Sequence, residues 1–124
     1  MRPVDQTTFG VPGGNCFSAC VASLLHLAID DVPYFMGADN WFEAFAEWLR
    51  PRGFYPLLLK LWLSPEDTWR PAGFYILGGQ CMRGSHAVVA RGNEIVHDPH
   101  PSRAGLDTFE DATLLVPLDP ADLA

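Results

Sequence analysis

A cysteine that could act as a nucleophile follows a glycine turn near the start of the chain, in Gly13-Gly14-Asn15-Cys16. Glycine takes backbone conformations that other residues avoid, and asparagine is a common helix N-cap, so Cys16 is expected at the first position of a helix. There the helix dipole and unpaired N–H groups favour the thiolate. The stretch predicts a nucleophilic thiol, and the alternative is a buried structural cysteine.

A histidine and an aspartate later in the chain could complete a catalytic site. A cysteine nucleophile needs a base near its sulfur, and the base needs a partner that holds its ring. His86 opens one predicted strand and Asp98 closes the next, with Gly92-Asn93 between them as a hairpin signal. We therefore expect His86 to be the general base and Asp98 to orient it.

The pairing of these two strands sets a condition on the triad. With a strict two-residue turn, Ala87 would face Asp98 and His86 would point to the other side of the sheet. With a three-residue turn, His86 would lie opposite Asp98. The triad therefore predicts an odd-length turn or a β-bulge in this hairpin.

Other histidines leave alternatives open. His86 could be an ordinary strand residue, and His97 or His100 could be the base, although a regular strand turns His97 away from Asp98. These three histidines and Asp98 could also bind a metal, but their spacing matches no standard zinc pattern, and we expect neither a metal nor a cofactor. His26, late in the first helix, is expected to cap or pack.

An acyl-transfer site also needs hydrogen-bond donors for the oxyanion of its tetrahedral intermediate. The backbone N–H of Cys16 is a natural first donor, and a side-chain amide could be the second. Gln6 lies upstream of the cysteine, and Gln80 lies in the loop before His86. The residue types alone leave both glutamines open.

Composition limits the class of protein. The chain has 124 residues, 48% of them apolar, which predicts a single globular domain over 1–124. The net charge of −7, with eight scattered Lys and Arg, gives no basic footprint for nucleic acid or an anionic membrane. No apolar run has membrane-spanning length, and three cysteines without a CxxC pair give no disulfide framework, so we expect a cytoplasmic protein.

The elements that must position these residues follow from periodicity and turn signals. Helices are predicted over about 16–27, which is apolar nearly all round, and about 40–50, where Asn40 and Glu43 resemble a capping box. Strands are predicted over 54–62, 73–79, 85–91, 94–98 and 112–118, with 64–72 as a loop. Pro56 indicates an edge strand or a strand start. Helices followed by strands predict an α+β fold with a mostly antiparallel sheet.

The ordered set of Gln6, Cys16, His86 and Asp98 resembles the papain-like cysteine peptidases, most of all the bacterial C39-type (bacteriocin-processing-like) peptidase domains. The segments that match that family are Gln6, Cys16-Phe17-Ser18-Ala19-Cys20, His86-Ala87-Val88-Val89 and Asp98-Pro99. The resemblance implies a papain-like fold and a Cys-His-Asp triad, with Gln6 as the oxyanion donor. It covers the two ends of the chain and says little about 30–75.

The chain departs from this family around the cysteine. Phe17 stands where glycine is common, Asn15 stands where aspartate is common, and Gly10 to Gly14 lengthen the loop after Gln6. Export-linked members cut leader peptides after a double glycine and are joined to a membrane transporter. Because no transporter portion accompanies this chain, we expect a small stand-alone relative of the kind found in bacteria and their phages.

Together these features predict a thiol hydrolase that cleaves a peptide or other amide bond through an acyl-enzyme, with a peptide or protein as substrate. The same site could carry out acyl transfer or deamidation. The alternative from another class is a catalytically silent papain-like module that binds a peptide or a protein. Trp41, Trp62 and Trp69 could line a specificity pocket.

Overall fold

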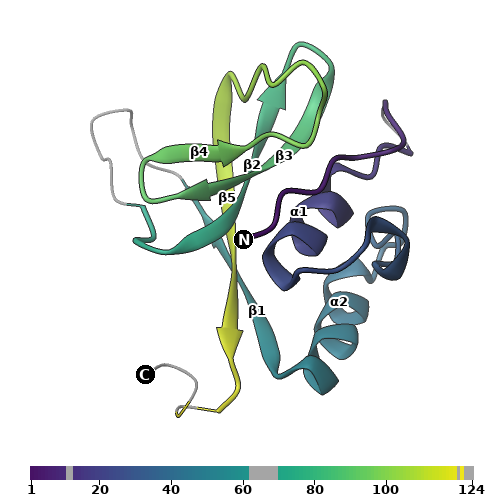
Figure 1. Cartoon of the computed structure of the whole chain (residues 1–124), viewed down its shortest axis with the longest axis vertical. Coiled ribbons are helices and arrows are strands. Elements are labelled where there is room, and N and C mark those ends of the chain that lie inside the picture. Colours follow the sequence, from purple (N-terminus) through teal and green to yellow (C-terminus); the bar gives the residue numbers. More distant parts are fainter. Residues whose placement is uncertain (11–12, 62–69, 120, 122–124) are drawn as a thin grey trace.

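The computed structural model describes residues 1–10, 13–61, 70–119 and 121. These residues form two α-helices, two short 3₁₀ helices and one five-stranded antiparallel sheet, and both α-helices lie on the same face of the sheet (Figure 1). The elements are α1 (Cys16–Leu25), η1 (Ile29–Asp31), α2 (Trp41–Leu49), η2 (Arg50–Arg52), β1 (Phe54–Lys60), β2 (Phe74–Cys81), β3 (Gly84–Arg91), β4 (Glu94–His97) and β5 (Thr108–Pro117). The predicted α+β class with an antiparallel sheet is confirmed.

The helix α1 is the buried helix of the fold. Its residues from Phe17 to Ser23 are buried, and it packs against β3 and β2. It ends at Leu25 and is followed by its C-cap residue His26, which is exposed and has a left-handed φ of 58°. The apolar central helix is therefore confirmed, and His26 caps it through the backbone.

The helix α2 is amphipathic and packs on β1 through a face that includes the buried Phe45 and Leu49. The capping box expected at its start is wrong, because the Asn40 side chain makes no hydrogen bond to the first turn. At φ −98° and ψ 32°, the Asn40 backbone lacks the extended conformation in which a cap side chain reaches back to the helix N–H groups.

The strand order is β1-β5-β2-β3-β4, so the last strand lies between the first two. The strand β1, which contains Pro56, is an edge strand, as predicted. The prediction started β5 at Ala112, but the strand begins at Thr108 and includes the charged residues before Ala112. The predicted loop 64–72 lies largely in 62–69, outside the described residues.

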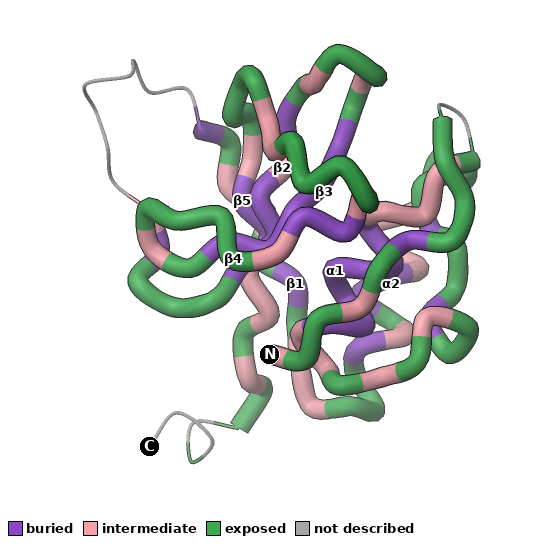
Figure 2. The backbone as a smooth tube through the Cα atoms, turned by 45° about the horizontal axis from the view of Figure 1, so that its top comes forward, coloured by how far each residue is buried: buried purple, intermediate pink, exposed green. Residues whose placement is uncertain are grey.

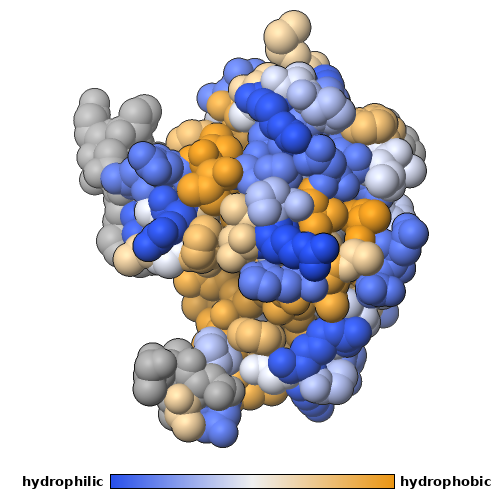
Figure 3. Space-filling view, viewed as in Figure 1, coloured by the Kyte–Doolittle hydropathy of each residue, from blue (hydrophilic) through white to orange (hydrophobic). Residues whose placement is uncertain are grey.

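Buried side chains form two clusters on opposite faces of the sheet, and the buried parts of the tube concentrate on α1, β2 and β3 (Figure 2). The helix-side cluster includes Phe17, Val21, Phe35, Phe45, Leu49, Ile76 and Val89. The second cluster contains Leu61, Tyr75, Leu77, Val88, Ala90 and Ala112. Some apolar side chains remain exposed, including Tyr55 and Val116 on β1 and β5, and apolar residues gather around these strands (Figure 3).

Candidate active site

The glycine turn delivers Cys16 to the first residue of α1, as predicted. Gly13 has a φ of 105°, a region that favours glycine. Gly14 donates its N–H to the Gly10 carbonyl at 3.0 Å, and a Cβ at Gly14 would lie only 2.6 Å from that oxygen. Both glycines are therefore needed for the tight turn that brings the cysteine to the helix start.

His86 and Asp98 form a buried pair at the end of the hairpin. His86 Nε2 lies 2.7 Å from Asp98 Oδ1, and the two side chains are only 5% and 3% exposed. The carboxylate also accepts the N–H groups of His100 at 2.9 Å and Gly105 at 2.7 Å. Burial alone would raise the pKa of Asp98, but these three hydrogen bonds hold that pKa below its ordinary value.

The hairpin contains the irregularity that the triad requires. Gly92-Asn93 is a two-residue turn, and the register then shifts so that Val96 is an extra residue on β4. Because side chains alternate along a strand, this bulge returns His86 and Asp98 to the same side of the sheet. The predicted β-bulge is confirmed.

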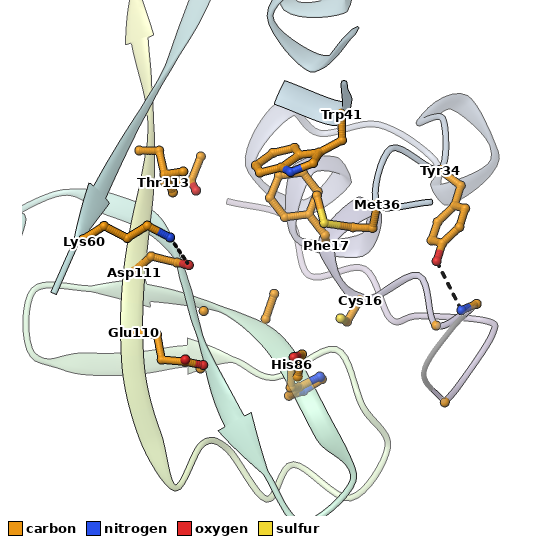
Figure 4. Close-up of a pocket in the computed structure, with 18 residues that line it drawn as sticks. Cys16, Phe17, Tyr34, Met36, Trp41, Lys60, His86, Glu110, Asp111 and Thr113 are labelled. Atoms are coloured by element: carbon orange, nitrogen blue, oxygen red, sulfur yellow. Dashed lines mark hydrogen bonds and ion pairs between the residues drawn. The ribbon is translucent and has the colours of Figure 1, made fainter. Parts of the chain in front are cut away.

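Cys16 and His86 both line each of two cavities, of about 340 and 170 Å³. Figure 4 shows both residues among those that line the larger cavity. Since His86 Nε2 is bonded to Asp98, Nδ1 is the ring nitrogen left to act on the thiol. The sheet supplies the imidazole and its carboxylate, and the helix supplies the sulfur.

The Cys16 thiol has a raised pKa, which corrects the expectation that the helix start would favour the thiolate. Burial is the largest cause. The N–H groups of Ala87, Phe17 and Cys16 itself bond the sulfur and lower the pKa, so the predicted stabilisation exists, but burial outweighs it. The negative charge of Asp98 raises the pKa further. The environment therefore disfavours the thiolate, and a nucleophilic role for Cys16 requires a base.

Gln6 lines the smaller cavity together with Cys16, although it is ten residues from Cys16 along the chain. Its side chain is buried, and Nε2 donates one hydrogen to the Thr8 carbonyl at 2.9 Å. The amide nitrogen therefore has a second hydrogen for a ligand in the cavity. Gln80, the rival donor, instead donates Nε2 to Ser85 and Glu110.

Asn15 holds this leader segment in place. The prediction that its side chain caps α1 is wrong, because Oδ1 accepts the N–H groups of Thr7 and Thr8 at 2.9 and 3.0 Å. Asn15 Nδ2 donates to Thr7 Oγ1 at 2.9 Å. These bonds close the long glycine loop, so its extra length does not move Gln6 away from Cys16.

We expect Asn15→Ala to lower the free energy of unfolding by about 2 kcal/mol, because three side-chain hydrogen bonds are lost. Asn40→Ala is the matched control, since Asn40 also precedes a helix without capping it, and its effect should stay within about 0.5 kcal/mol. Urea unfolding of the two variants measures both values. Equal losses would contradict the anchoring role of Asn15.

A second anchor of the leader escaped the sequence analysis. Arg103 donates to both carboxylate oxygens of Asp5, at 2.6 and 2.9 Å, and to the backbone carbonyl of Asp98 at 2.6 Å. The Gln6 N–H bonds the Pro99 carbonyl at 3.1 Å. Arg103 thus joins the segment that carries Gln6 to the loop that carries Asp98. No local signal marks this contact, because 98 residues separate its partners.

The other histidines are engaged elsewhere. His97 Nε2 faces the Val4 carbonyl at 3.0 Å and Asp5 Oδ1 at 3.2 Å. His100 lines the smaller cavity, but its Nδ1 accepts the Ser102 N–H, and burial followed by the charge of Arg83 lowers the pKa of its ring. Within the described part of the chain, no group of three or more His, Cys, Asp or Glu is arranged to hold a metal.

The other cysteines and the three tryptophans of the sequence analysis lie in the core, in the cavities or outside the described residues. Cys20 is fully buried one turn after Cys16, and all three cysteines are free. Trp41 lines the larger cavity, together with Phe17, which packs edge-on against Trp41. Trp62 and Trp69 lie outside the described residues.

Comparison with known proteins gives no relative: no protein-family model, curated protein or solved structure matches the chain. Among the described residues, no helix is long and apolar enough to cross a membrane. The function must therefore be argued from the chemistry of the site.

Proposed function

We propose that this protein is a cysteine-dependent hydrolase that cleaves a peptide or other amide bond, with Cys16 as the nucleophile. The observation that carries the proposal is the buried His86–Asp98 pair beside the cavities that Cys16 lines. A histidine held by an ionised carboxylate is the usual activator of a thiol or hydroxyl nucleophile. A purely structural cysteine would not need this pair at the opening of a cleft.

The reaction follows from these positions. His86 Nδ1 removes the Cys16 proton as Sγ attacks the carbonyl carbon, and the oxyanion accepts hydrogen bonds from the Cys16 N–H and from Gln6 Nε2. His86 then returns the proton to the leaving amine, which departs and leaves a thioester. Water attacks the thioester with His86 as the base, and the thiol and a carboxylic acid are released.

Asp98 has two tasks in this scheme. Its Oδ1 fixes the proton of His86 on Nε2, so that Nδ1 presents a lone pair to the thiol. Because its pKa is lowered, Asp98 remains ionised at neutral pH and stabilises the imidazolium that forms during attack. The proton that Cys16 cannot readily give to water can therefore pass to His86.

We further propose that the fold is papain-like. In its support, the nucleophile opens the central helix, the base lies on β3, the acid directly follows β4, and an upstream glutamine lines the same cavity as the cysteine. Cys16 thus belongs to the helical layer, whereas His86 lies in the sheet and Asp98 lies at the end of one of its strands. Acyl transfer and deamidation use the same thioester and differ in the acceptor or in the amide attacked.

Acetylation by p-nitrophenyl acetate tests the nucleophile without knowledge of the substrate. We expect a burst of one p-nitrophenolate per chain, and intact-mass and peptide analysis should locate one acetyl group on Cys16. Cys16→Ala should abolish the burst, whereas Cys81→Ala, which removes the other partly exposed thiol, should keep it. Acetylation that favours Cys81, or a burst that survives Cys16→Ala, would refute the proposal.

A further inference from the structure

The larger cavity continues from Cys16 along the sheet and changes character along its length. Near the thiol its wall is apolar and includes Phe17, Met36 and Trp41. Its far side is polar and is formed by β1 and β5, where Lys60, Glu110 and Asp111 lie (Figure 4). A substrate group that extends from the thiol therefore lies first against apolar side chains and then against the charged side chains of β1 and β5.

Asp111 occupies the floor of this cavity because Gly78 leaves room for it. The two residues are paired across β5 and β2, and a Cβ on Gly78 would collide with the Asp111 carboxylate. Gly78 in turn pairs with Ala87, whose N–H bonds the Cys16 sulfur. Adjacent strands are about 4.8 Å apart, so the backbone of Asp111 lies roughly 10 Å from that of Ala87.

The Asp111 carboxylate is weakly neutralised. Among the described residues, the structure pairs it with Lys60, whose Nζ is 3.9 Å away and whose side chain is 58% exposed. Glu110 differs, because it accepts the Gln80 amide at 2.8 Å. Burial raises the pKa of Asp111, in keeping with a carboxylate that lacks full compensation.

We propose that this cavity selects substrates with a long cationic side chain, lysine or arginine, next to the bond that Cys16 attacks. The aliphatic stem would lie on the apolar wall, and the charged end would pair with Asp111. An extended lysine side chain spans roughly 6 Å, which is shorter than the roughly 10 Å between the backbones of Ala87 and Asp111. The inference rests on the proposed function, since it names the substrate class of the same site.

Peptidyl chloromethyl ketones, which alkylate a cysteine nucleophile, give the test. Two pairs of probes are compared, and each pair consists of a probe with lysine and a matched probe with norleucine, the uncharged analogue. In the first pair the varied residue bears the electrophile, and in the second pair it is the residue before. In one of the two pairs we expect the lysine probe to inactivate Cys16 about tenfold faster than the norleucine probe. Equal rates in both pairs would overturn the inference.

Two variants should move this preference in opposite directions. Asp111→Asn should abolish the lysine preference, and Lys60→Met should increase it, because the competing ammonium is removed. Glu110→Gln is the matched control and should keep the preference. A preference that survives Asp111→Asn, or that depends on Glu110 instead, would refute the role of Asp111.

Failure of this inference is distinguishable from failure of the proposed function. p-Nitrophenyl acetate carries no cationic side chain, so its reaction with Cys16 does not depend on a bond to Asp111, and the Glu110→Gln control should retain the acetylation burst. A normal acetylation burst without lysine preference would overturn the inference alone. Loss of the burst in the unmodified protein would overturn the proposed function first, and the substrate class with it.

Discussion

Replacement of His86 by Asn is expected to slow the alkylation of Cys16 by iodoacetamide at pH 7 by about 100-fold, the usual scale of general-base assistance. Burial raises the pKa of the thiol, so without a base few molecules carry the reactive thiolate at neutral pH. The measurement uses a Cys81→Ser background, because Cys81 is the other partly exposed thiol. Cys20 is left in place, since it is fully buried and burial raises its pKa further.

The pH profile separates loss of the base from general damage to the site. In His86→Asn the alkylation rate should rise about tenfold for each pH unit, up to and beyond the ordinary thiol pKa, because it follows the thiolate fraction. With His86 present the rise should be shallower. His100→Asn is the control: it removes the rival imidazole but leaves the backbone N–H that bonds Asp98. An equal loss of reactivity in His100→Asn would contradict the assignment of the base.

Local signals were sufficient for the parts of the site that lie within one element or one hairpin. The helix start at Cys16 follows from glycine chemistry and an apolar run, and both are visible in sequence. The bulge at Val96 follows from the strict alternation of side chains, once His86 and Asp98 are required to share a face. Such features depend on residues that are near one another along the chain.

Features that depend on distant pairing could not be predicted. The strand β5 begins at Thr108 because it inserts between β1 and β2, where Gly78 makes room for Asp111. A charged residue before an apolar run, such as Asp111, indicates a loop unless its partner on the neighbouring strand, here Gly78, is known. Asn15 shows the same limit: its cap preference is local, but Thr7 and Thr8 offer N–H groups that only the folded leader brings near.

The burial of Cys16 raises the pKa of its thiol, although its position at the helix start predicted a lowered pKa. The N–H groups at the helix start do bond the sulfur, but the depth of the site was not visible from the sequence. Burial disfavours a charged thiolate more than those bonds favour it. Under the proposed mechanism, activation of the thiol therefore depends on His86 and Asp98, and their substitution is the sharpest test of that proposal.

Asp98→Ala is expected to lower the free energy of unfolding by about 3 kcal/mol, because it leaves one buried and two partly buried donors without an acceptor. These are His86 Nε2–H and the N–H groups of His100 and Gly105. Urea unfolding measures the loss. Acetylation of Cys16 should also slow about 100-fold, since the imidazole is no longer oriented.

Asp98→Asn separates the orientation of the His86 ring from the negative charge of Asp98. One carboxylate oxygen of Asp98 accepts two hydrogen bonds and the other accepts one. An asparagine oxygen at the Oδ1 position keeps the bonds from His86 and His100 and loses only that from Gly105. That orientation is favoured, and it leaves the His86 proton on Nε2. Acetylation should therefore fall only about tenfold, for want of the negative charge that stabilises the imidazolium. A slower reaction in Asn than in Ala would contradict this geometry.

The same pair of variants gives a pH dependence of stability. The pKa of Asp98 is lower in the folded chain than in the unfolded one, so its contribution is fully present above the unfolded value of about 3.9 and is lost as the pH falls through the folded value. Between pH 5 and pH 2 the free energy of unfolding should therefore fall less steeply in Asp98→Asn than in the unmodified protein. Parallel curves would show that the buried carboxylate is not stabilised by its three donors. The stability curve at acid pH thus reports directly on the carboxylate that bonds His86.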